Sequence, residues 1–579
     1  MLTGAARAVK TGSAAYHRGP SRLTVPQPPF YRRGVTSDTP DEPPPPPAAD
    51  ALPEYVRALL NPTLYSHRPD RVDLVQTHIS YVFLAGPRVF KTKKPVNFGF
   101  INQVELEERR LNCEREIALN NRLSAGVYLG VRKVLRLSDG SYALAEDEPP
   151  PGAEIVEYAV EMKRLPDDRI LANLLDRNEV PPTLMRRLAA RLLEFHEHAA
   201  VVPNDPSFAG AEAERNWWAR EQSEAEPFIG STWEPNDANT LKRYVAQVLD
   251  REAALFDQRL AEGRVIDGHG DLHAMHIYLI DDEIVIVDCL EFTEWFQFRL
   301  EDAGYDIAFT AMDLEARGRP DLGEEVAGRY IAAAGDETMS VLQPLHRAFR
   351  AFVRGKVESM GAHAPEVPAE QQAALAQSAS RYFALASKYS ARAAEPMLIL
   401  LAGVSGTGKS TVGATLAARI GAAYVSSDIV RKSLAGIPAR EHVPADRTAE
   451  VYGAPMTART YQELRTRAAA HLAAGRPVVL DATHSKASDR SAALKVARDA
   501  GVPALIAELR IANDDALARI AERATDPLAT SDATAEVYAA QTETFEPISA
   551  TEGVHLALDA SQDLDDLVDE IAGSLSAAG

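Results

Sequence analysis

Cysteine is scarce in this chain, whose 579 residues include only Cys113 and Cys289. Two cysteines so far apart support neither a disulfide framework nor a cysteine-rich zinc site, and they suit the reducing cytoplasm that we expect. No apolar run approaches the length that a membrane span needs. The formal net charge of −21 argues against nucleic acid and anionic membranes as partners, although a local basic pocket is compatible with it.

Length and composition predict a soluble protein of several domains, with 46% hydrophobic and 25% charged residues. Residues 1–50 contain five consecutive prolines at 43–47 and few large apolar side chains, so we expect a disordered tail. Six Arg or Lys residues precede the first acidic residue, Asp38, as in an organellar transit peptide. The segment lacks a clear amphipathic helix, which favours a flexible tail or a start codon assigned too early.

The most specific motif lies at residues 403–411 and matches G-x-x-x-x-G-K-[ST] at every fixed position. An apolar run at 396–402 precedes it and a helical, alanine-rich segment follows, so backbone amides and a helix N-terminus can bind a polyphosphate. We expect Lys409 to reach the β- and γ-phosphates of ATP and Ser410 to bind Mg²⁺. The expected ATP-binding residues are Gly403, Val404, Ser405, Gly406, Thr407, Gly408, Lys409, Ser410 and Thr411.

Charged residues follow the next two predicted strands of this region. A strand at 423–426 leads to Asp428, a candidate base for a substrate hydroxyl, and to Arg431, a candidate contact for a substrate anion. A strand at 477–480 ends in Asp481, which resembles the Walker-B acid that binds Mg²⁺.

A strand at 505–510 precedes a helix that places Arg519 and Arg523 on one face. A polar segment at 525–545 follows and suits a mobile lid. The two arginines are predicted to neutralise charge on a transferring phosphoryl group, or alternatively to form a solvated face paired with Glu522 and Asp526.

The amino-terminal half contains a second set of candidate residues. Residues 79–93 predict a β-hairpin that carries Lys91, and a helix at 104–123 carries Glu116. A strand at 158–162 would lead to a linker between two lobes, and the region 339–395 reads as helical with a break near 362–368. His196 and His198, on a helix at 184–200, face different sides and therefore do not form a zinc pair.

Residues 265–292 carry the chemistry of this half. His269-Gly270-Asp271-Leu272-His273 precedes a turn at 281–282 and an apolar strand that ends in Asp288. In the protein-kinase H-R-D pattern, the loop aspartate accepts the proton of the attacking hydroxyl and a later aspartate holds Mg²⁺. We expect these roles for Asp271 and Asp288, and we expect Asp306 to brace the loop.

This H-G-D-L-H sequence resembles the aminoglycoside phosphotransferase-like kinases over about residues 52–390. The resemblance implies a protein-kinase-like, two-lobed α+β fold, ATP and Mg²⁺ as cofactors, and a small-molecule hydroxyl as phosphate acceptor. It also implies Lys91 as the phosphate-binding lysine, Glu116 as its partner, Asp271 as the base and Asp288 as a metal ligand.

One position departs from the pattern of that family. His276 stands where the family has an asparagine that binds metal, and an imidazole is a poor ligand for Mg²⁺. The domain would then use one Mg²⁺, use a softer metal through His276, or have little activity.

The carboxy-terminal region resembles P-loop kinases of the gluconate kinase and polynucleotide kinase type over about residues 396–560. The fusion resembles bacterial proteins described as bifunctional aminoglycoside phosphotransferase/ATP-binding proteins. We predict a tail at 1–50, a kinase-like domain at 51–392 and an α/β P-loop domain with a parallel sheet at 393–579, docked because no long linker separates them. A regulatory ATP-binding protein and a nucleic-acid end kinase remain alternatives, because fold analogy does not specify a substrate.

Overall fold

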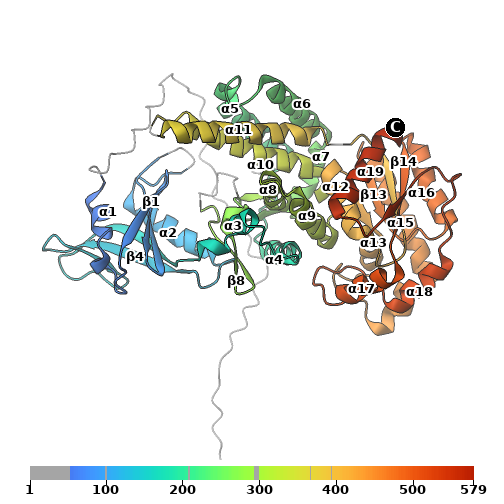
Figure 1. Ribbon diagram of the computed structural model, residues 1–579, viewed down its shortest axis with the longest axis horizontal. Coiled ribbons are helices and arrows are strands. Elements are labelled where there is room, and N and C mark those ends of the chain that lie inside the picture. Colours follow the sequence, from blue (N-terminus) through green and yellow to red (C-terminus); the bar gives the residue numbers. More distant parts are fainter. Residues whose placement is uncertain are drawn as a thin grey trace, which may run out of the picture.

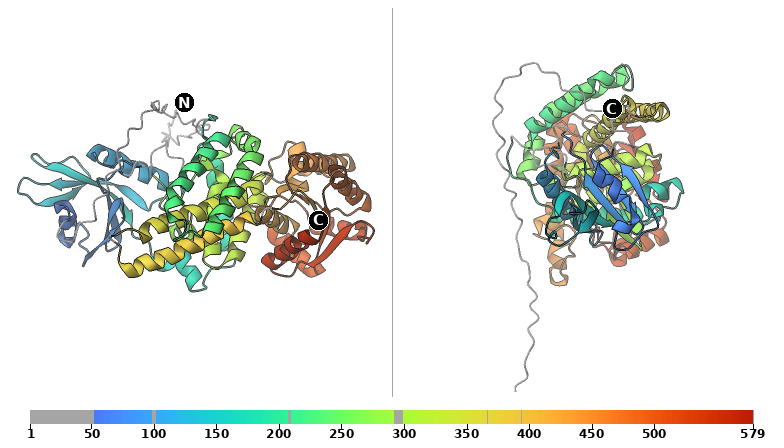
Figure 2. Two further views of the ribbon diagram at one scale, coloured as in Figure 1. Left: turned by 90° about the horizontal axis from the view of Figure 1, so that it is seen from above. Right: turned by 90° about the vertical axis from the view of Figure 1, so that its left-hand side faces the viewer.

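The computed structural model describes residues 52–97, 101–206, 209–291, 299–365, 367–392 and 394–578. The predicted tail at 1–50 lies outside these residues. A sheet, a group of helices and a second sheet follow one another along the longest axis of the molecule (Figures 1 and 2). Among the described helices, none is long and apolar enough to cross a membrane.

The first sheet is antiparallel and confirms the predicted hairpin, because Val82 pairs with Lys91 across its two strands. The short helix α1 (Glu54–Leu59) and the longer α2 (Leu106–Asn120) accompany the sheet, and α2 carries Glu116 as expected. In spatial order the strands are β1 (Val72–Gln76), β2 (Ser80–Ala85), β3 (Arg88–Lys93), β6 (Glu154–Lys163), β4 (Tyr128–Arg136) and β5 (Tyr142–Ala145).

Helices dominate the middle of the molecule. The predicted break is confirmed, since α10 (Met339–Ala362) ends and α11 (Ala369–Ser390) begins on either side of it. Two small antiparallel sheets, β7 (Val265–Asp267) with β10 (Leu300–Asp302) and β8 (Ile277–Ile280) with β9 (Glu283–Ile286), carry the segment predicted to be catalytic. The other helices are α3 (Leu171–Asp176), α4 (Leu184–His198), α5 (Ala211–Ala225), α6 (Pro235–Arg251), α7 (Ala253–Ala261), α8 (Ala303–Ala316) and α9 (Pro320–Ala334).

The second sheet is entirely parallel, and the predicted α/β fold of this region is confirmed. Its strands are, in spatial order, β12 (Ala423–Ser426), β13 (Val478–Asp481), β11 (Leu398–Ala402), β14 (Ala504–Arg510) and β15 (Val554–Asp559). Every residue of β11 is buried, as expected for a strand covered on both faces. The helices are α12 (Lys409–Ile420), α13 (Ser427–Leu434), α14 (Thr448–Val451), α15 (Ala454–Ala473), α16 (Ala487–Ala500), α17 (Asn513–Arg523), α18 (Ala535–Thr544) and α19 (Leu564–Ala578).

Two details of this region differ from the prediction. Asp428 lies in the first turn of α13 rather than at the end of a strand, because the helix begins directly after β12. The segment expected to form a polar lid contains α18, whose first turn is capped by the Thr534 side chain. A cap of this kind satisfies an amide that would otherwise lack a partner.

The amino-terminal and P-loop regions share one hydrophobic core, so they are docked, as we predicted from the short connection between them. Val326 and Tyr330 of α9 belong to the same buried cluster as Leu416 of α12. Gly328 brings the backbone of α9 so close to α12 that a Cβ atom there would lie 1.9 Å from Oγ1 of Thr415. The helix that begins at the P-loop therefore rests directly on the amino-terminal part of the chain.

Candidate active sites

The loop between β11 and α12 has the glycine-dependent conformation that its motif predicts. Gly403 and Gly406 have φ angles of 138° and 83°, which disfavour other residues. A Cβ atom on Gly406 would also lie only 2.5 Å from the carbonyl oxygen of Ala516. The loop turns tightly into α12, whose first residues line a cleft of about 1700 Å³. The first amides of a helix have no partner within that helix and can bind an anion.

The residues predicted to hold phosphate and metal lie together in this cleft. Nζ of Lys409 donates to the carbonyl oxygen of Val404 at 2.8 Å, and burial lowers the pKa of this lysine. Asp481 ends β13 and accepts a hydrogen bond from the Tyr424 hydroxyl at 2.6 Å. Ser410 also lines the cleft. Hydroxyl and carboxylate oxygens are ligands that Mg²⁺ prefers, so Ser410 and Asp481 fit this ion.

Asp428 and Arg431 line the same cleft from α13. Burial raises the pKa of Asp428, against the opposing effect of a hydrogen bond with Ser531. Arg431 is 8% exposed and donates to the carbonyl oxygen of Val451 and to Oγ1 of Thr457, at 3.2 and 3.1 Å. Its Nε has no partner among the described residues. The arrangement provides a carboxylate able to take a proton and a guanidinium at the wall of the same cleft.

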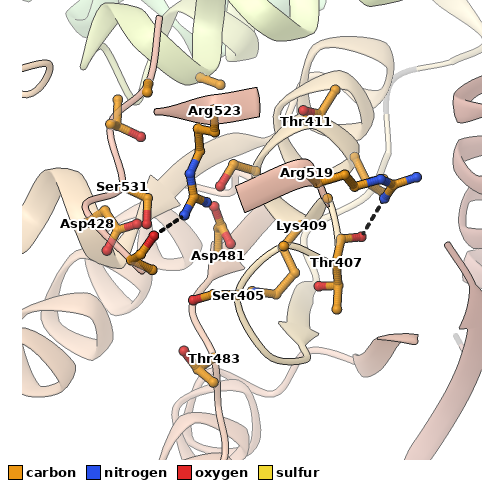
Figure 3. Close-up of a pocket in the computed structure, with 18 of the residues that line it drawn as sticks. Ser405, Thr407, Lys409, Thr411, Asp428, Asp481, Thr483, Arg519, Arg523 and Ser531 are labelled. Atoms are coloured by element: carbon orange, nitrogen blue, oxygen red, sulfur yellow. Dashed lines mark hydrogen bonds between the residues drawn. The ribbon is translucent and has the colours of Figure 1, made fainter. Parts of the chain in front are cut away.

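Arg519 and Arg523 both enter the cleft from α17 (Figure 3). Arg519 donates to the carbonyl oxygens of Thr407 and Ala560, at 3.4 and 2.9 Å, and Arg523 donates to that of Ala533 at 3.0 Å. In Figure 3, Arg523 lies between Asp428 and Lys409, whereas Arg519 lies on the other side, beside Thr407. Arg519 is exposed and Arg523 is half-buried, and both side chains border the cleft.

Several residues of the cleft have no recognisable signal in the sequence. The side chain of Gln541 on α18 accepts a hydrogen bond from the amide of Ser405, in the P-loop, at 2.7 Å. Arg186 of α4 and Arg329 of α9 reach the cleft from the amino-terminal part of the chain. Arg186 also forms an ion pair of 2.5 Å with Glu522, so this acid is paired across the interface and not with Arg519 or Arg523.

In the amino-terminal half, the predicted lysine and glutamate are in contact. Nζ of Lys91 lies 2.9 Å from Glu116 and 3.3 Å from Asp288. Lys93 also contacts Glu116, at 2.5 Å, but its side chain is fully buried and its other partner is Glu291. Lys91 is the one of the two for which a contact with Asp288 is found.

Asp306 braces the loop that carries Asp271. Its carboxylate accepts hydrogen bonds from the backbone amides of His269 and Gly270, at 2.8 and 2.9 Å. His196 lies buried beside it, with Nε2 3.2 Å from the same carboxylate. His196 therefore has a structural role on α4, as its spacing from His198 suggested.

The other side chains of the loop converge on Asp271 and Asp288. Burial raises the pKa of Asp271, but the neighbouring His273 and His276 outweigh this effect and hold it below its usual range. Lys91 is the main cause of the low pKa of Asp288. Asp288 also has a φ of 58°, a strained value for a residue other than glycine. Both carboxylates are thus ionised at neutral pH.

An AAA-domain family model matches residues 398–548, which contain the P-loop and the cleft. The uncharacterized protein Rv2004c of Mycobacterium tuberculosis is 33% identical over 475 residues, which cover 81% of this chain and 89% of the mycobacterial one. This chain belongs to the same family as Rv2004c. The uncharacterized protein Mb2027c of Mycobacterium bovis has the same identity and coverage, so the similarity extends well beyond the P-loop region.

Solved structures resemble each region separately. A gluconokinase from Sinorhizobium meliloti is 24% identical, with a TM-score of 0.23, over 31% of this chain and 93% of its own. A choline/ethanolamine kinase family protein from Mesorhizobium loti is 13% identical, with a TM-score of 0.33, over 57% of this chain and 98% of its own. With TM-scores this low, neither likeness bears on the activity of this chain.

Proposed function

We propose that this chain is an ATP-dependent kinase whose P-loop cleft transfers a phosphoryl group to a hydroxyl of a small molecule. The observation that carries the proposal is the position of Asp428, which faces the same cleft as Lys409 and has a pKa raised by burial. An ATPase needs no side-chain base for an organic hydroxyl, whereas a kinase benefits from one.

The predicted residues of the cleft would have different roles in this reaction. The P-loop amides and Lys409 bind the phosphates, and Arg519 and Arg523 offset the charge that spreads over the transferring group. Asp428 takes the proton of the acceptor hydroxyl as the oxygen–phosphorus bond forms. The guanidinium of Arg431, which lines the cleft, would contact an anionic or polar group of the acceptor. Mg²⁺, held by Ser410 and Asp481, would neutralise phosphate charge when bound.

The amino-terminal half would provide a second nucleotide site. Lys91, which pairs with Glu116 and Asp288, would contact phosphates. Asp271 would serve as the base and Asp288 as a metal ligand. Catalysis at this second site would make the chain a bifunctional kinase. We give it as a proposal separate from the P-loop cleft, because residue 276 is a histidine where the resembled family has an asparagine.

Transfer from labelled ATP to a panel of polyols and sugars, aminoglycosides and oligonucleotide 5′ ends tests the proposal. The full chain carrying Asp271→Asn isolates the P-loop cleft. We expect transfer to a small-molecule hydroxyl, and we expect Lys409→Ala to remove it. Transfer to oligonucleotide ends alone would favour an end kinase, and hydrolysis without any transfer would favour a regulatory ATPase.

The pH dependence of the transfer should report Asp428. Because burial raises the pKa of Asp428, this base becomes protonated at a higher pH than an exposed aspartate does. We expect kcat/KM to fall as the pH is lowered through an apparent pKa above the usual aspartate range, since kcat/KM reports the free enzyme. The measurement is a pH profile in the Asp271→Asn variant. The same acid limb in an added Asp428→Asn variant would contradict the assignment.

A further inference from the structure

The hydrogen bonds of His276 determine which of its ring nitrogens is free. Nδ1 lies 2.9 Å from the backbone carbonyl oxygen of Asp271. A carbonyl oxygen only accepts, so Nδ1 must carry the proton of the neutral ring and Nε2 must carry the lone pair. A histidine that donates from Nδ1 to a backbone carbonyl is the usual arrangement of a metal ligand.

The free nitrogen faces a carboxylate rather than a hydrogen-bond donor. Nε2 of His276 lies 3.8 Å from Oδ2 of Asp288, which is too long for a hydrogen bond. Lys91 lies 3.3 Å from the other oxygen, Oδ1, and leaves Oδ2 available. Two electron-pair donors at this separation match two ligands that share one cation, since each would be about 2.0–2.2 Å from it.

The histidine next to this pair has a different role. Nδ1 of His273 accepts from the amide of Met275 at 3.3 Å, so its Nε2 carries the proton and points to Asp271, with Nε2 3.7 Å from Oδ2. His273 therefore orients Asp271 rather than serving as a ligand in this arrangement. Donor atoms of Asp271, His273 and His276 all lie within 4.8 Å of one another, and Oδ2 of Asp271 is 3.6 Å from Nδ1 of His276. The Asp271 carboxylate therefore lies beside the pair, on the Nδ1 side of the ring.

The chemistry of the ligands selects the ion. Mg²⁺ binds oxygen ligands and avoids imidazole, whereas imidazole with carboxylate suits Mn²⁺, Co²⁺ and Zn²⁺. We propose that His276 and Asp288, with Asp271 beside them, bind a divalent transition-metal ion in preference to Mg²⁺. The site lies in the amino-terminal half, and its existence does not depend on phosphoryl transfer at the P-loop cleft.

Titration of the metal-free full chain with Co²⁺, without nucleotide, tests this site through the visible absorption of the ion. A Ser410→Ala background removes the metal ligand of the P-loop cleft. We expect one equivalent of bound Co²⁺, displaced by Zn²⁺ at micromolar excess but not by Mg²⁺ at millimolar concentration. His276→Asn should weaken Co²⁺ binding by about tenfold or more, because it removes a nitrogen ligand.

The control is His198→Asn, the same substitution at an exposed histidine of α4 whose Nδ1 bonds to Glu194 of its own helix. It should leave Co²⁺ binding unchanged. Asp288→Asn is the second test, and its half-exposed side chain makes misfolding of that variant a small risk. Unchanged Co²⁺ affinity in His276→Asn, or in Asp288→Asn if the first variant misfolds, would overturn the proposal. So would equal losses in His276→Asn and His198→Asn.

Discussion

Replacing Asp428 with asparagine should slow phosphoryl transfer at the P-loop cleft by about 10²–10⁴-fold while leaving nucleotide affinity unchanged. The substitution keeps the shape of the side chain and removes its ability to accept a proton. Asp428 lies in the first turn of α13, and the nucleotide-binding loop lies between β11 and α12, so the change does not alter the expected phosphate contacts.

Lys409→Ala provides the contrast that makes this result specific. Lys409 lies within the P-loop itself, so it should contact phosphate in both the ground state and the transition state. Its loss should therefore weaken ATP binding and slow transfer together. Nucleotide titration beside single-turnover transfer, with Asp271→Asn present to silence the other half, separates the two patterns.

Asp563→Asn is a matched control for the loss of a carboxylate, because Asp563 lines the same cleft but is exposed. It should have little effect on transfer. If Asp428→Asn transfers phosphate at the parental rate, Asp428 is not the base. The cleft would then be better explained as the site of an ATPase or a nucleotide sensor.

The sequence predicted those parts of the cleft that a local pattern determines. The glycine spacing of the P-loop reflects positive φ angles and close backbone contacts, so it can be recognised without the rest of the fold. Asp481 was identifiable because an acid directly after an apolar strand lies at the edge where parallel strands end. The α/β fold of this region followed from the same alternation of apolar runs and helical segments.

The residues of the cleft that could not be predicted depend on contacts between segments far apart in the sequence. Tyr424 bonds to Asp481 across 57 residues, and Gln541 bonds to the P-loop across 136. No spacing in the sequence identifies Tyr424 or Gln541, because the fold, and not a local turn, brings each of them to its partner. Arg329 reaches the cleft only because α9 packs on α12, which depends on the docking of the two regions.

In the amino-terminal site, too, some residues could be predicted from the sequence and one could not. Lys91, Glu116 and Asp288 could be related by the order of a known loop and strand pattern, and the structure places them in contact. The role of His276 could not be inferred from its identity alone. It depends on which ring nitrogen meets the carbonyl oxygen of Asp271, and only the folded loop determines that.

Gly328→Ala should destabilise the whole chain and weaken nucleotide binding, although alanine is a better helix former than glycine by about 0.5–1 kcal/mol. The added Cβ atom would lie 1.9 Å from Oγ1 and 3.0 Å from Cβ of Thr415, which is fully buried. Rotation of the Thr415 side chain cannot remove the second contact, so α9 and α12 must separate. Overpacking of this kind typically costs about 1–3 kcal/mol.

Gly573→Ala is the matched control, because Gly573 also lies within a helix but a Cβ atom there meets nothing within 4 Å. Thermal unfolding should show a lower Tm for Gly328→Ala and an equal or higher Tm for Gly573→Ala. Addition of Thr415→Ala to Gly328→Ala should recover part of the loss, since it removes the nearest atom. If Gly328→Ala keeps the parental Tm and ATP affinity, the close packing of α9 on α12 does not support the P-loop. The cleft would then bind nucleotide independently of the amino-terminal half.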